Sequence, residues 1–114
     1  NSDKEIDNYA KRMADRFGKL PEELENLFYV VKIRNAGAVI GFEKIIVKNG
    51  LLIAFFVSNP MSPYYKSRSF ASVMEKIAAN QSTIELKQNE TKLKILSRNV
   101  LSLKQAYGIL GKLK

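Results

Sequence analysis

The spacing of apolar residues changes at Phe42, and this change constrains the fold more than any other feature of the sequence. Before it, apolar residues recur every three or four positions, as on one face of a helix. After it, residues 45–47 and 51–57 are β-branched and aromatic runs joined by Asn49-Gly50, a pair that suits a tight hairpin turn because both turn positions need a positive φ. The second run is apolar on both faces, which predicts a central or sandwiched strand.

Two helices are predicted before Phe42. Residues 3–17 place their apolar side chains on one helical face, Gly18 closes this helix, and Pro21 occupies the first position of the next. The second helix is expected to run through Gly37 to Gly41, where small residues permit close approach to a neighbour. We expect the two helices to form a buried pair, with Phe17 in the core.

The rest of the chain predicts a helix, a second hairpin and a final helix. Ser62-Pro63 supplies an N-cap and a first helical position for the helix. In the hairpin, residues 84–86 and 93–95 alternate apolar with charged side chains on either side of Asn89-Glu90. Residues 100–113 place their apolar side chains on one side of the final helix. No βαβ alternation is present. The sequence therefore predicts an α+β fold in which two N-terminal helices precede two β-hairpin-plus-helix units and a largely antiparallel sheet packs against helices. The two hairpin-plus-helix units have the same element order, which is consistent with a duplication. This inference rests on element order alone, because no residues match between the two units.

Length and apolar runs indicate one domain without a membrane span. The 114 residues fit the usual size of one domain, so residues 1–114 are expected to fold as a single domain. The longest apolar run, residues 51–57, has the length of a strand, and the first residues lack the apolar stretch of a secretory signal. The chain does not begin with Met, and we expect a domain excised from a larger chain.

Most catalytic chemistries lack their residues in this sequence. It contains no Cys and no His, which removes thiol nucleophiles, Ser-His-Asp triads and Cys/His zinc sites. The glycines match no phosphate-binding loop. The acids at positions 22, 23 and 25 are explained by their favourable interaction with a helix dipole, without an acid/base role. The acids at positions 3, 5 and 7 are explained by a solvated helix start, without a metal site. We therefore expect no enzyme activity and no catalytic, cofactor-binding or metal-binding residues, although a lone carboxylate or Tyr site stays open.

The net charge of +8 is concentrated in one part of the chain. Residues 1–43 hold seven Lys/Arg against eight Asp/Glu, whereas residues 44–114 hold twelve against three. Such asymmetry favours an anionic partner, either nucleic acid or an acidic protein face, although solvated lysines serve solubility equally well. The candidate contacts are aromatic and basic residues in two segments: Tyr64, Tyr65, Lys66 and Arg68, and Lys87, Lys92, Lys94 and Arg98. At least one of the two tyrosines is expected to be structural instead.

The junction of the first two helices carries a family resemblance. Its sequence, DRFGKLPEELENL from Asp15 to Leu27, resembles the DRFG-x-LP-x-E-V-x-N-L signature of the C-terminal domain of bacterial transcription-repair coupling factors, the Mfd family. Leu24 replaces the commoner Val. The matching positions are Asp15, Arg16, Phe17, Gly18, Leu20, Pro21, Glu23, Asn26 and Leu27. Beyond Phe42 the resemblance rests on element order and hydrophobic pattern.

The resemblance implies a regulatory part of a large bacterial, cytoplasmic protein that couples transcription to nucleotide excision repair of DNA damage. In that family an ATP-dependent DNA translocase and an RNA polymerase-binding module lie upstream. The C-terminal domain is implied to be non-catalytic and to pack on the N-terminal excinuclease-B-like module, masking the surface that binds excinuclease A. The competing hypothesis is a small basic nucleic-acid-binding module. We expect a monomer, because no long heptad pattern is present.

Overall fold

The predicted element order and the α+β class are confirmed by the computed structural model, which describes residues 2–90 and 92–114. Two helices, α1 (Asp3–Phe17) and α2 (Glu22–Ile40), precede the hairpin of β1 (Phe42–Lys48) and β2 (Leu51–Phe56). A short 3-10 helix, η1 (Pro63–Lys66), leads into α3 (Arg68–Ala79). The second hairpin, β3 (Glu85–Asn89) and β4 (Lys92–Arg98), leads into α4 (Leu103–Gly111).

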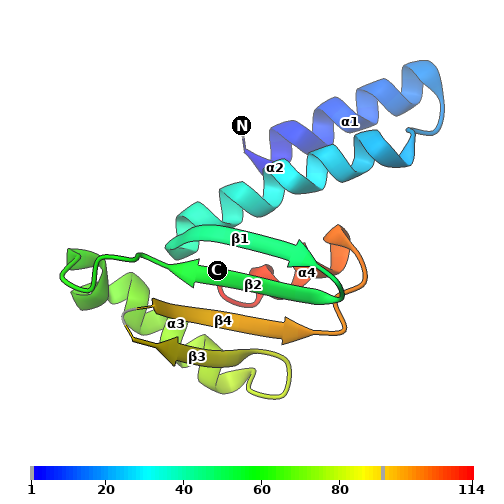
Figure 1. Cartoon of the computed structure of the whole chain (residues 1–114). Helices are drawn as coiled ribbons and strands as arrows, with labels where there is room; N and C mark the ends of the chain where they lie inside the picture. Colours follow the sequence, from blue (N-terminus) through cyan, green and yellow to red (C-terminus); the bar gives the residue numbers. More distant parts are fainter. Residues whose placement is uncertain (1, 91) are drawn as a thin grey trace.

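The four strands form one antiparallel sheet in the order β1-β2-β4-β3. Asn49 and Gly50 both have positive φ, 54° and 77°, as the hairpin turn requires. Strand β2 is central, as predicted, but it is not sandwiched: α3 and α4 lie behind the sheet in Figure 1, and the opposite face carries no helix of the described chain. Alternate residues of β2 are accordingly buried and partly exposed.

The core lies between the sheet and the helices behind it. It joins the second half of α2 to β2, β4, α3 and α4 through fifteen buried apolar side chains: Ile33, Ala36, Ile40, Phe42, Leu52, Ala54, Phe56, Val73, Ile77, Ile84, Ile95, Val100, Ala106, Leu110 and Leu113. Gly37 allows β1 to approach α2, since a Cβ at this position would overlap the Ile45 side chain. The expected close approach at this small residue is thus confirmed.

Helix α1 and the first half of α2 form a two-helix arm that projects from this body (Figure 1). The Cα radius of gyration is 15.5 Å, against about 13 Å for a compact chain of this length. The buried pair expected from the sequence is wrong, because α1 buries no residue and Phe17 is 71% exposed. Among the described residues, the outer part of each helix of the arm is covered mainly by the other helix, and α4 reaches only its inner part, where Tyr107 packs on Tyr29, so burial stays partial.

Three element starts differ from expectation. Pro21 is the N-cap of α2, and the helix begins one residue later. Ser62 and Pro63 open η1 rather than α3, which starts anew at an N-cap formed by Ser67. Val100 is buried but precedes α4, whose N-cap is Ser102. Among the helices of the described chain, none combines the length and apolar character required to cross a membrane.

Candidate interaction surfaces

The signature segment forms the free end of the arm. It comprises the last turn of α1, the connecting turn and the first turns of α2. Gly18, with a φ of 85°, donates its N–H to the Ala14 carbonyl at 2.8 Å and so ends α1. No residue between Asp15 and Leu27 is buried, and Phe17 and Leu27 are 71% and 55% exposed. The signature therefore presents apolar side chains to solvent.

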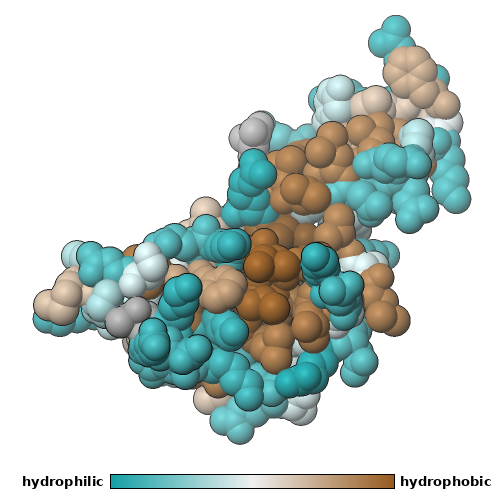
Figure 2. Space-filling view, in the orientation of Figure 1, coloured by the Kyte–Doolittle hydropathy of each residue, from teal (hydrophilic) through white to brown (hydrophobic). Residues whose placement is uncertain are grey.

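A shallow groove with both apolar and polar lining residues follows the arm between its two helices. Its lining includes Ile6 and Tyr9 of α1 and Phe28 and Val31 of α2. The Tyr9 and Phe28 rings meet edge to face with centroids 6.0 Å apart, and this contact joins the two helices. Figure 2 shows apolar residues along the arm between hydrophilic ones. The arm is thus an amphipathic element whose apolar surface is only partly covered by the described chain.

Polar contacts fix the inner end of the arm to the body. Tyr107 of α4 donates a hydrogen bond to the Asp3 carboxylate, and the Lys114 ammonium lies 3.9 Å from the same group. Lys32 of α2 forms an ion pair with Asp7. The hydrogen bond to Asp3, followed by burial, raises the pKa of Tyr107 to about 12. These contacts restrain the start of α1, whereas its end at Phe17 has no comparable anchor in the described residues.

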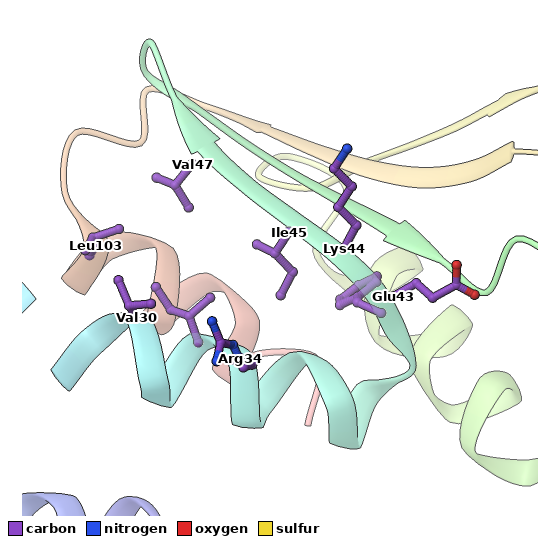
Figure 3. Close-up of a pocket in the computed structure, with 9 residues that line it drawn as sticks. Val30, Arg34, Glu43, Lys44, Ile45, Val47 and Leu103 are labelled. Atoms are coloured by element: carbon purple, nitrogen blue, oxygen red, sulfur yellow. The ribbon is translucent and has the colours of Figure 1, made fainter. Parts of the chain in front are cut away.

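A second groove lies where α2 passes beside β1 (Figure 3). Ile45 and Val47 point from β1 toward the helices, Val30 faces Leu103 of α4, and Lys44 points away on the other side of the strand. The groove has a volume of about 350 Å³ and a mixed lining, in which Arg34, Glu43 and Lys44 accompany the apolar side chains. Throughout the described residues, no group of three or more acidic side chains is placed to hold a metal ion. The apolar side chains of the groove suit contact with another apolar side chain.

Tyr64 and Tyr65 are integrated into the body of the protein. Their hydroxyls donate to the carbonyls of Ile40, at 2.5 Å, and of Val57. Their rings also pack with Phe70, at centroid distances of 5.4 and 5.1 Å. Burial raises the pKa of Tyr64 to about 12 and also raises that of Tyr65. Both rings therefore serve the core contacts and the joint between α2 and β1, which leaves little of them to stack on a base.

The predicted basic contacts do not form one surface. The strand register places Lys87, Lys92, Lys94 and Arg98 on the face of the sheet away from the helices. Arg68, in contrast, lines a hollow with residues of α2, α3 and the C-terminal segment. Lys66 is an exposed residue at the end of η1.

We call the face of the sheet away from the helices the open face. Two further cations of this face, Lys44 and Lys48, were missed by the sequence reasoning. Both lie on β1 and share the face of Lys94. Their alternation with Ile46 before the Asn49-Gly50 turn was the available signal. Glu85 is an acid on this face, where Arg98 and Lys87 contact it at 2.8 and 3.5 Å. The hydrogen bond from Arg98 is the main cause that lowers the pKa of Glu85.

Comparison with known proteins gives one match. A family model described as the TRCF domain matches residues 1–67, which include the whole arm, the first hairpin and η1. No curated protein matches the chain. No solved structure matches it either.

Proposed function

Since the chain belongs to the TRCF domain family, a family of transcription-repair coupling factor domains, we propose that it is the C-terminal regulatory domain of such a factor. The family domain is a non-catalytic part of a translocase-containing protein that takes part in transcription-repair coupling. In the proposed role, residues 1–114 act as one domain and pack on the N-terminal excinuclease-B-like module of the same protein in the bacterial cytoplasm. This packing masks the surface that binds excinuclease A.

The exposed signature at the end of the arm is the observation that carries this proposal. Phe17 is 71% exposed, and the Arg16 guanidinium lies 5.5 Å from its ring centroid. Burying a Phe side chain at an interface contributes about 2 to 3 kcal/mol. The arm projects far enough for its tip to meet another module without displacing the body (Figure 1). We therefore place the masking contact at Phe17 and Leu27.

Regulation follows if this contact exists in two states. A masking contact worth a few kcal/mol keeps the module closed in most molecules and opens it in a small fraction. A partner that binds only the open state, such as excinuclease A, then shifts the population toward release. Interfaces between modules of one chain are typically modest and polar, which suits a reversible contact. In this scheme the arm acts as an autoinhibitory element.

Calorimetric titration of the chain into the excinuclease-B-like module tests the contact. Wild-type chain should bind saturably, and Phe17→Ala should weaken binding about 30-fold, equivalent to about 2 kcal/mol. Met61→Ala is the matched control, because Met61 is also an exposed apolar residue, at 84%, and lies in the loop before η1. Both variants should unfold at the wild-type urea concentration. Equal affinities of wild type and Phe17→Ala would refute the assignment of the arm.

The competing nucleic-acid hypothesis is decided by the same titration into duplex DNA. It predicts affinity that falls steeply with salt, since each phosphate contact releases counterions, and it predicts loss of binding on charge reversal at Lys92 and Lys94. Tight DNA binding without module binding would favour that hypothesis.

In the parent protein, Phe17→Ala should raise basal activity and affinity for excinuclease A, because it weakens the masking contact. Unchanged activity and unchanged affinity would refute the autoinhibitory role.

A further inference from the structure

The open face of the sheet carries an apolar cross. Leu51, Ile53 and Phe55 point outward along β2, and the register places Ile46 of β1 and Leu96 of β4 on either side of Ile53. All five side chains are partly exposed. Figure 2 shows apolar residues gathered over the middle of β1 and β2 and bordered by hydrophilic ones. We use "apolar cross" for these five residues.

Four cations occupy the corners of the apolar cross. Lys48 and Arg98 flank Leu51 from β1 and β4, and Lys44 and Lys94 flank Phe55 from the same two strands. Arg98 contacts Glu85, but within the described residues Lys44, Lys48 and Lys94 have no carboxylate within 4.0 Å. The Lys94 ammonium instead lies 5.6 Å from the Phe55 ring centroid. Cationic charge therefore remains available on both sides of β2.

A second observation defines the edge of this surface. Glu43 lies at the irregularity in β1, and its carboxylate accepts a hydrogen bond from the Ser58 N–H at 2.9 Å. It lines a hollow with Lys44, Phe55 and Lys92. This acid is held at the rim by a backbone N–H, and in the described residues it forms no ion pair with Lys44, Lys48 or Lys94.

The composition of the surface favours a protein partner. Four of the five residues of the apolar cross are aliphatic, and aliphatic surface gains from burial against apolar side chains. Single-stranded nucleic acid is bound on several aromatic rings, whereas the described residues of these strands place one ring on this face, that of Phe55, already beside Lys94. A second copy of the chain in a symmetric face-to-face contact would place Lys and Arg against Lys and Arg. The matching chemistry is an apolar ridge with acids along both flanks.

The dimensions of the surface fit one helix. Strand β2 has six residues, a length of about 20 Å, equal to a helix of about 13 residues. The cations of β1 and β4 are two strand spacings apart, about 10 Å, close to the diameter of a helix. We propose that the open sheet face docks an amphipathic α-helix of a partner protein along β2, with its apolar stripe on the apolar cross and Asp or Glu on both flanks. This contact is separate from that of the arm.

A synthetic helix tests this docking directly. The probe is a hydrocarbon-stapled peptide of about 13 residues with a Leu stripe and Glu on both flanks, because an unstapled helix of this length is marginal in water. Its partner probe carries Gln in place of each Glu. Titration of the isotope-labelled chain should shift the amide signals of the apolar cross saturably below about 1 mM, with the Gln peptide at least tenfold weaker, or about 1.4 kcal/mol. Signals of the arm should not move.

Charge reversal supplies the matched control. Lys44→Glu/Lys48→Glu should weaken the Glu peptide about tenfold, whereas Lys11→Glu/Lys19→Glu makes the same net charge change on exposed residues of the arm and should not. Both variants should keep the wild-type circular dichroism spectrum. The proposal is overturned if the Glu peptide leaves the apolar cross unperturbed at about 1 mM, if the Gln peptide binds equally, or if both variants behave alike. Stronger shifts with oligothymidine, or concentration-dependent shifts without a probe, would assign the face to nucleic acid or to self-association and also overturn it.

Discussion

Replacing Gly41 by Ala tests the joint between α2 and the sheet. Gly41 ends α2 with a φ of 115° and precedes β1 directly. A Cβ at this position would overlap the Tyr64 ring, whose hydroxyl donates to the Ile40 carbonyl at 2.5 Å. Two costs therefore coincide at one residue, a backbone conformation that side chains avoid and a collision with a ring that fixes the end of α2.

The expected loss of stability follows from these contacts. The positive φ costs about 1 to 2 kcal/mol for a residue with a Cβ. Displacing the Tyr64 ring adds about 1 to 3 kcal/mol of overpacking, and its hydrogen bond contributes about 1 kcal/mol. The free energy of unfolding should fall by about 4 kcal/mol in total, which lowers the melting temperature by about 15 °C for a chain of this size.

Urea unfolding followed by circular dichroism measures this loss, with an unchanged m-value showing that the two-state transition persists. Gly108→Ala is the matched control, because Gly108 lies within α4 and a Cβ there meets nothing within 4 Å; it should stabilise by about 0.5 to 1 kcal/mol. In a Tyr64→Ala background, Gly41→Ala should cost only the backbone strain, about 1 to 2 kcal/mol. A loss under about 1 kcal/mol in the native background, or equal losses in both, would refute the reasoning.

Two further predictions concern the arm's anchor and the start of α3. The pKa of Tyr107 is raised from 10.0 to about 12, so the folded state holds the hydroxyl proton more tightly than the unfolded state does. The contribution of the protonated Tyr107 side chain to the free energy of unfolding is therefore complete below about pH 10 and is lost as the pH rises to about 12. The unfolding free energy of Tyr107→Phe, measured across that range, should fall less steeply than that of wild type, and parallel curves would contradict the assignment. Ser67→Ala removes the side chain that accepts the Phe70 N–H at 3.1 Å and should cost about 1 to 2 kcal/mol, whereas Ser62→Ala, at the cap of the short η1, should cost less in the same urea assay.

The apolar periodicity predicted the elements because each has a strong local signal. The Asn49-Gly50 turn, the change of period at Phe42 and the small residue at Gly37 are visible in neighbouring positions alone, and the structure confirms them. The burial of the arm was predicted wrongly for a related reason. An amphipathic pattern at residues 3–17 shows that a helix has an apolar face, but it does not show whether the rest of the chain reaches that face.

The starts of η1 and α3 depended on contacts that no local pattern reveals. Ser62-Pro63 and Ser67 are both acceptable helix starts, and the choice between them follows from Tyr64 and Tyr65, whose hydroxyls reach carbonyls of other segments. The open sheet face was hidden similarly. Its corner cations come from β1 and β4, and only the strand order places β4 beside β2.

The two halves of the chain contribute differently to the two proposed contacts. The family match at residues 1–67 contains the arm, the Gly41 joint and the β1 side of the apolar cross, whereas β4 and α4 lie outside it. Yet Tyr107 anchors the start of α1, and β4 pairs with β2. The second half therefore holds the arm at its inner end and completes the sheet. We expect changes at Tyr107 to loosen the arm at its inner end, and changes at Lys94, Leu96 and Arg98 to alter the open sheet face instead, because these three residues pair with β2, whereas Tyr107 contacts α1.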